Sequence, residues 1–87
     1  MILRIKELDV VGEYTLRLLF NNGVRKTVNV WPLLDGPIFE PLRKVDAFSQ
    51  ATLDPVCGTV VWPNGADLAP EALLELAAAP EPSHSGK

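Results

Sequence analysis

Two alternating stretches, residues 13–20 and 24–30, constrain the fold of this chain more than any other feature. In each stretch the apolar side chains recur at every second position, and the polar side chains occupy most of the positions between them. A period of two over this length predicts half-buried β-strands. Only Asn21-Asn22-Gly23 separates the two stretches, so we expect them to pair as an antiparallel hairpin.

The loop of this hairpin can be read in two ways. An Asn-Gly pair favours a two-residue turn, which would place Phe20 opposite Arg25. A three-residue loop with Gly23 in a left-handed conformation places Phe20 opposite Val24 instead and keeps one face apolar. Because the buried face determines the register, we predict the longer loop. In that register Lys26 faces inward, so we expect its stem to pack while its amine reaches water at an edge.

The rest of the chain predicts an α+β domain with a small antiparallel sheet of about five strands. The sheet would comprise two hairpins and an N-terminal strand that has a bulge near Glu7, where the apolar parity slips. We expect a short middle helix and a C-terminal helix that begins near Pro70, ends at Pro80 and packs on one face. The expected strands are residues 2–10, 13–20, 24–30, 50–54 and 59–62, in one domain over residues 1–79 followed by a flexible tail over residues 80–87.

Composition and charge exclude several classes of protein. With 87 residues the chain is one domain, and no apolar run approaches the roughly 20 residues that a membrane-spanning helix needs. Five basic and three acidic residues in 1–30 give a net charge of +2, whereas three basic and eight acidic residues in 31–87 give −5. Direct nucleic-acid binding is therefore not expected. A single cysteine, Cys57, excludes an internal disulfide, and we expect a cytoplasmic protein with no signal peptide and no contact with a membrane.

The best candidate site lies between Val60 and Glu71, where a strand ends in Trp62 and a turn leads to a helix. We expect Trp62 to pack against Leu73 or Leu76 and Asp67 to accept backbone N–H groups at the turn or the helix start. This corner and the aromatic and acidic residues of the other turns form the candidate interaction or structural corner: Trp31, Asp35, Phe39, Trp62, Asn64, Asp67 and Glu71.

No arrangement in the sequence predicts catalysis. The carboxylates Asp35, Asp67 and Glu71 could perform acid–base chemistry if two of them were buried and close, but we favour turn and cap roles for them. The only histidine, His84, lies in the expected tail, and Cys57 occupies a turn with no base beside it. We therefore expect no catalytic residue, no metal, no cofactor and no enzymatic activity.

Three ordered motifs carry a family resemblance, and they are Phe20-Asn21-Asn22-Gly23, the segment from Leu34 to Leu42, and the segment from Thr59 to Glu71. Together they resemble a family of small prokaryotic proteins known as domain of unknown function 2442. The resemblance covers roughly residues 2–76 and implies an antiparallel sheet with short helices. Because no activity is established for the family, the resemblance supplies no catalytic residues.

These observations lead to two expectations for function. The first is a small interaction or regulatory module whose partner is another small protein, as in an antitoxin-like pair, or a second copy of itself. The alternative is an accessory domain of a transcriptional regulatory system whose DNA reader lies on another chain. For the first, an open sheet edge or an apolar patch would be the contact surface.

Overall fold

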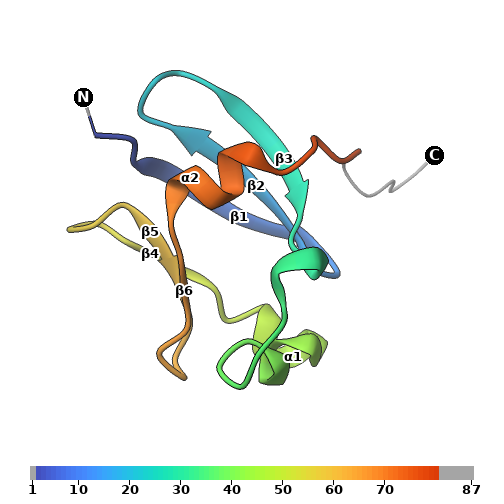
Figure 1. Ribbon diagram of the computed structural model, residues 1–87. Helices are drawn as coiled ribbons and strands as arrows, with labels where there is room; N and C mark the ends of the chain where they lie inside the picture. The colour runs from blue at the N-terminus through green and yellow to red at the C-terminus, as the bar shows by residue number, and fades with distance from the viewer. Residues whose placement is uncertain (1, 81–87) are drawn as a thin grey trace.

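In the computed structural model, which describes residues 2–80, the chain forms two three-stranded antiparallel sheets and several short helices (Figure 1). The first sheet has the order β1-β2-β3 and the second has the order β4-β5-β6. In chain order the elements are β1 (Ile5–Gly12), β2 (Thr15–Phe20), β3 (Arg25–Asn29), the 3-10 helices η1 (Trp31–Leu33) and η2 (Glu40–Arg43), α1 (Val45–Phe48), β4 (Thr52–Asp54), β5 (Thr59–Val61), β6 (Asp67–Leu68) and α2 (Pro70–Glu75).

The first hairpin has the predicted three-residue loop. Leu16 pairs with Val28, and the Phe20 N–H donates to the Val24 carbonyl at 2.9 Å. Gly23 has a φ of 90°, a conformation that costs glycine little because it has no Cβ. The preference of Asn-Gly for a two-residue turn therefore yields to the burial of one apolar face.

Lys26 lies opposite Leu18 as predicted, and its side chain is partly exposed. The Nζ atom donates a hydrogen bond to the Leu74 carbonyl near the end of α2. A cation at that end of a helix compensates carbonyls that have no partner within the helix. Lys26 thus fastens the last helix to the inner face of the first sheet.

Strand β1 contains the predicted bulge and also meets the second hairpin. The pairing with β2 shifts between Ile5 and Glu7, and again between Val10 and Gly12. At its first residue β1 donates one backbone bond to the β4–β5 turn, from the Ile5 N–H to the Gly58 carbonyl at 2.9 Å. This bond links the two sheets without extending either ladder.

The prediction of one sheet with about five strands is wrong. The second hairpin forms where expected, but it makes its own sheet with β6, whose Leu68 pairs with Val60. Strand β6 has two residues, which is too short to show any periodicity, so no pattern in the sequence indicates it. Pro32 and Pro37 lack the N–H groups that a strand ladder requires, and the segment between the hairpins turns through η1, η2 and α1. The second hairpin therefore packs beside the first sheet.

Helix α2 begins at Pro70 as predicted, but it ends at Glu75 instead of at Pro80. Leu76 is extended, and the chain then runs along the outer edge of β3, where Ala78 bridges to Val28. The Ala79 N–H donates to the Thr27 carbonyl at 2.7 Å. This segment covers part of a sheet edge that would otherwise be exposed. The predicted tail lies, apart from its first residue, outside the described residues.

One hydrophobic core joins both sheets and the helices. Figure 1 shows α2 lying across the first sheet, with the second sheet and α1 beside and below it. Among the described residues no helix is long and apolar enough to cross a membrane. The buried apolar side chains form one cluster of Ile5, Leu16, Leu18, Phe20, Val28, Val30, Leu34, Leu42, Phe48, Val60, Trp62, Ala66, Leu68 and Leu73.

Candidate interaction surface

Trp31 is the most prominent aromatic side chain on the surface. It follows β3 at the start of η1, and 47% of the residue is exposed. The Tyr14 ring lies with its centroid 4.8 Å from the Trp31 ring, and the Arg43 guanidinium carbon lies 5.3 Å from the Trp31 centroid. Together with Asp35, which binds Arg43, these residues form a group that we call the Trp31 cluster.

Two further bonds fix the position of Arg43 in the Trp31 cluster. Its Nη2 atom donates to Asp35 Oδ1 at 2.9 Å, and its Nε atom donates to the Leu34 carbonyl at 2.8 Å. The ion pair is well exposed, so it adds little stability by itself. Its effect is geometric, because the two bonds hold the guanidinium beside the Trp31 ring. A cation in that position is attracted to the face of the aromatic ring.

Tyr14 connects the Trp31 cluster to the core. It lies in the turn between β1 and β2 with a φ of 58°, the only positive φ at a residue other than glycine in the described part of the chain. Its hydroxyl donates to the Arg43 carbonyl, and its ring meets the buried Phe48 ring edge-on at 5.5 Å. A left-handed tyrosine is strained, so the contacts around it must compensate for that cost.

Trp62 has the opposite environment to Trp31. Only 3% of it is exposed, and its indole Nε1 donates to the Phe48 carbonyl at 2.9 Å. Its ring centroid lies 5.8 Å from that of Phe48, so α1 supplies the contacts that define its position. Leu73, one of the two helix residues predicted to meet Trp62, belongs to the same buried core.

Asn64 joins the two long motifs of the sequence. Its Nδ2 donates to the Ile38 carbonyl at 2.9 Å, while its Oδ1 accepts from the Ala66 N–H at 3.0 Å. Phe39, next to Ile38, is partly buried against the core. Beside this junction lies a shallow, mainly apolar pocket of about 120 Å³, lined by Pro41, Leu42, Ala47, Gln50, Pro63 and Asn64.

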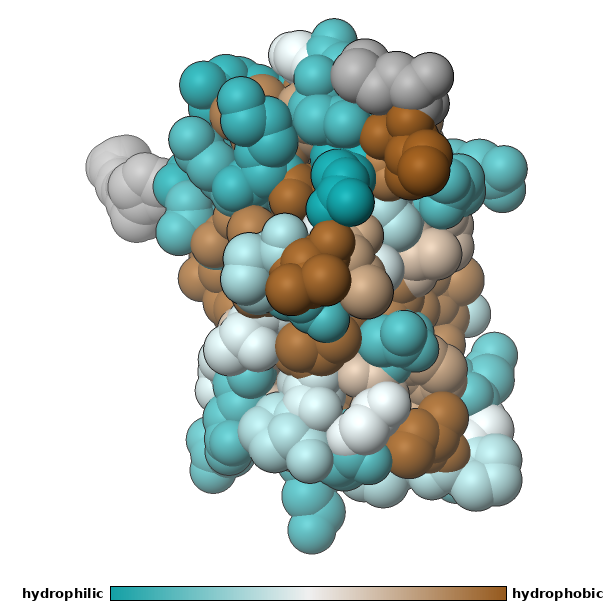
Figure 2. Space-filling model, turned by 90° about the vertical axis from the view of Figure 1, so that its left-hand side faces the viewer, coloured by the Kyte–Doolittle hydropathy of each residue, from teal (hydrophilic) through white to brown (hydrophobic). Residues whose placement is uncertain are grey.

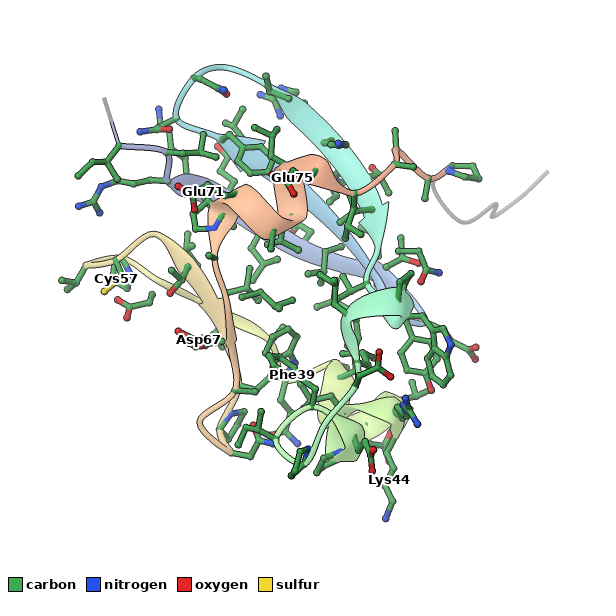
Figure 3. The ribbon with its side chains drawn as sticks, viewed as in Figure 1. Phe39, Lys44, Cys57, Asp67, Glu71 and Glu75 are labelled. Atoms are coloured by element: carbon green, nitrogen blue, oxygen red, sulfur yellow. The ribbon has the colours of Figure 1, made fainter. Side chains whose placement is uncertain are left out.

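Asp67 does not have the role that the sequence suggested. It lies exposed in β6, and the residue that precedes α2, Ala69, has no side-chain cap. Within residues 2–80 no hydrogen bond or ion pair involves the carboxylate of Asp67 or that of Glu71. Figure 3 shows these two side chains on separate elements, and Asn64 performs the turn-closing task assigned to Asp67.

The described residues contain no cluster suited to metal binding, since no three His, Cys, Asp or Glu side chains gather there. Cys57 is exposed at the β4–β5 turn, as Figure 3 shows, and is not part of a disulfide.

On the face of the molecule that Figure 2 presents, the apolar side chains form small separate patches between polar ones. That face therefore offers no broad apolar surface.

Sequence reasoning found Trp31 and Asp35 but missed Tyr14 and Arg43, which complete the Trp31 cluster. The predicted register held a usable signal for Tyr14, because it places Tyr14 opposite Val30, next to Trp31. No comparable signal marked Arg43, whose position depends on how η2 folds back toward η1. Five of the seven candidate residues thus fall into two corners, with Trp31 and Asp35 in one and Trp62, Asn64 and the nearby Phe39 in the other. Asp67 in β6 and Glu71 in α2 belong to neither.

Comparison with known proteins gives one match. No curated protein and no solved structure matches the chain. A family model described as a protein of unknown function (DUF2442) matches residues 5–79, which include both sheets and α2. This match confirms the resemblance carried by the three sequence motifs. The chain belongs to the DUF2442 family of proteins of unknown function.

Proposed function

We propose that this chain is a small, non-enzymatic protein-interaction module that contacts its partner through the Trp31 cluster. The observation that carries the proposal is the state of Trp31, which is half exposed and yet held by the Tyr14 ring and the Arg43 guanidinium. Tryptophan, tyrosine and arginine are the residues most enriched at the energetic centres of protein interfaces. A side chain that is already fixed loses little conformational entropy when a partner covers it.

The partner in this proposal is another small protein, and the pairing is regulatory, for example antitoxin-like with a neighbouring small protein. A second copy of the chain is the other form of partner. The free, exposed thiol of Cys57 supports a reducing compartment such as the cytoplasm of a bacterium.

The test compares Trp31→Ala with Val24→Ala as a matched control. Val24 is also an exposed large apolar residue, and it lies at the opposite end of β3 from Trp31. Tagged forms of both variants and of the wild type are used to capture bound proteins from the native host, and the captured proteins are quantified by mass spectrometry. Size-exclusion chromatography with light scattering measures self-association in parallel.

We expect Trp31→Ala to weaken the interaction by at least about 2 kcal/mol, roughly 30-fold, which is the loss at an interface hot spot. Val24→Ala should retain the partner, and thermal melts should show that both variants are folded. If Trp31→Ala binds the same protein or self-associates as strongly as the wild type, the Trp31 cluster is not the contact surface.

A further inference from the structure

The chain contains two Asn-Gly dipeptides that adopt nearly the same local turn. Gly23 and Gly65 have φ values of 90° and 93°. In each turn the asparagine Oδ1 accepts a hydrogen bond at 3.0 Å from the backbone N–H two residues later, which belongs to Val24 in one turn and Ala66 in the other. Each glycine N–H donates at 3.0 Å to the carbonyl three residues earlier.

The two turns differ in what holds the asparagine amide nitrogen. Asn64 Nδ2 donates to the Ile38 carbonyl at 2.9 Å, a contact with a segment 26 residues away in sequence. Within residues 2–80 no hydrogen bond is made by the Nδ2 of Asn22, and Asn22 is exposed. The neighbouring Asn21 is held at both side-chain ends, since its Nδ2 donates to the Ile2 carbonyl and its Oδ1 accepts from the Arg4 N–H.

We propose that Asn22 is a site of spontaneous deamidation in the folded protein and that Asn64 is protected. In this reaction the backbone nitrogen of Gly23 attacks Cγ of Asn22 and forms a new N–C bond. The Cγ–Nδ2 bond breaks, and the amide leaves as ammonia together with the proton lost by the attacking nitrogen. Water then opens the cyclic imide at either carbonyl and leaves aspartate or isoaspartate, so the reaction consumes only water.

The surroundings of Asn22 permit this attack. Glycine has no side chain to obstruct its nitrogen, and no atom of a residue beyond Asn22 and Val24 lies within 4 Å of the place where a Cβ of Gly23 would be. The space around Gly65 is equally open, so crowding does not distinguish the two sites. The difference lies in the side chain that must rotate to bring Cγ to the attacking nitrogen, because at Asn64 this rotation breaks the bond to Ile38.

The reaction would change the first hairpin in two ways. Either product adds a negative charge to a part of the chain that is net basic. Isoaspartate also adds one atom to the backbone of a three-residue loop, and the length of that loop fixes the register of β2 and β3. Modification at Asn22 is thus positioned to loosen the pairing of the first sheet.

The test is to incubate the folded full chain in mildly alkaline buffer and to follow both sites by peptide mapping with mass spectrometry. We expect Asn22 to react roughly two- to tenfold faster than Asn64, which is the rate equivalent of one net hydrogen bond. In concentrated denaturant the two rates should become equal, because the bond between Asn64 and Ile38 is lost. The variant Asn22→Ser should remove the signal from the hairpin peptide and thereby exclude Asn21 as its source.

Three results would overturn the proposal. They are equal rates at the two sites in the folded protein, faster reaction at Asn64, or a difference in rate that persists in denaturant. The last result would show that the local sequence, and not the tertiary hydrogen bond of Asn64, sets the rates.

Discussion

The substitution Trp62→Phe tests whether the buried tryptophan is structural, and its effect can be estimated from two contacts. The first is the hydrogen bond from the indole Nε1 to the Phe48 carbonyl, which phenylalanine cannot make. That carbonyl also accepts from the Ala51 N–H at 3.1 Å, so it keeps one partner after the change. The loss should therefore be about 1 kcal/mol, the net value of an ordinary hydrogen bond, without the full penalty of an orphaned buried group.

The second contact is the packing of the ring. Trp62 is almost completely buried beside Phe48, and a phenylalanine ring leaves part of that space empty. We estimate roughly 1–2 kcal/mol for this gap, a fraction of the ~3–5 kcal/mol expected for Trp62→Ala. The total of about 2–3 kcal/mol would lower the melting temperature by roughly 10–20 °C in a domain of this size.

Far-UV circular dichroism is the appropriate assay, because removing a tryptophan alters the fluorescence signal. Urea denaturation should show a lower midpoint with an unchanged slope, which separates a change in stability from a change in the unfolded state. Trp31→Phe is the matched control. Trp31 is half exposed and its indole nitrogen makes no hydrogen bond within residues 2–80, so its loss should stay below about 1 kcal/mol. Two results would refute the structural role of Trp62. They are equal losses of unfolding free energy in the two variants, or a loss in Trp62→Phe of less than about 0.5 kcal/mol.

Two further predictions concern the glycine turns of the second sheet and the hydrogen bond from Lys26 to α2. Gly65→Ala should cost about 1–2 kcal/mol for the left-handed backbone alone, whereas Gly58→Ala should cost more, because its Cβ would lie 2.6 Å from Arg4 Cβ. Thermal melts of the two variants check the order, and an equal loss would contradict it. Lys26→Met keeps an apolar stem but removes the donor to the Leu74 carbonyl, and it should cost about 0.5–1.5 kcal/mol in urea denaturation. Leu18, which lies opposite Lys26, should keep its place in the core. An unchanged unfolding midpoint in Lys26→Met would show that the bond from Lys26 to Leu74 contributes no stability.

The parts of the fold that the sequence predicted correctly are those determined by local chemistry. The register of the first hairpin follows from the parity of its apolar residues, and the start of α2 follows from the preference of Pro70 for the first helical turn. Positive φ at Gly23 follows from the reversal that the chain must make in the three-residue loop. In each case the residues that decide the structure lie within a few positions of one another.

The parts that the sequence did not predict depend on contacts between distant segments. Asp67 was expected to accept backbone N–H groups, but β6 places it in a strand, and Asn64 closes the turn instead. Arg43 lies in η2, and in the Trp31 cluster it binds Asp35 and the Leu34 carbonyl, both from the segment after η1. No pattern of spacing in the sequence indicates which exposed arginine will lie beside which aromatic ring.

The two Trp-Pro dipeptides lie in different backbone contexts, since Trp31 begins a 3-10 helix and Trp62 directly follows a strand. Val28 and Val30 are fully buried, but β3 ends at Asn29 and Val30 already has helical backbone angles, so Trp31 begins η1 and stays half exposed. Val60 is also fully buried, and Trp62 shares its parity and enters the core. Each strand ends before its tryptophan, at Asn29 in β3 and at Val61 in β5, and the proline that follows has no N–H with which to resume a ladder. The tryptophan that points inward therefore holds the scaffold, and the one that points outward is available to a partner. Substituting each in turn should separate the loss of stability from the loss of binding.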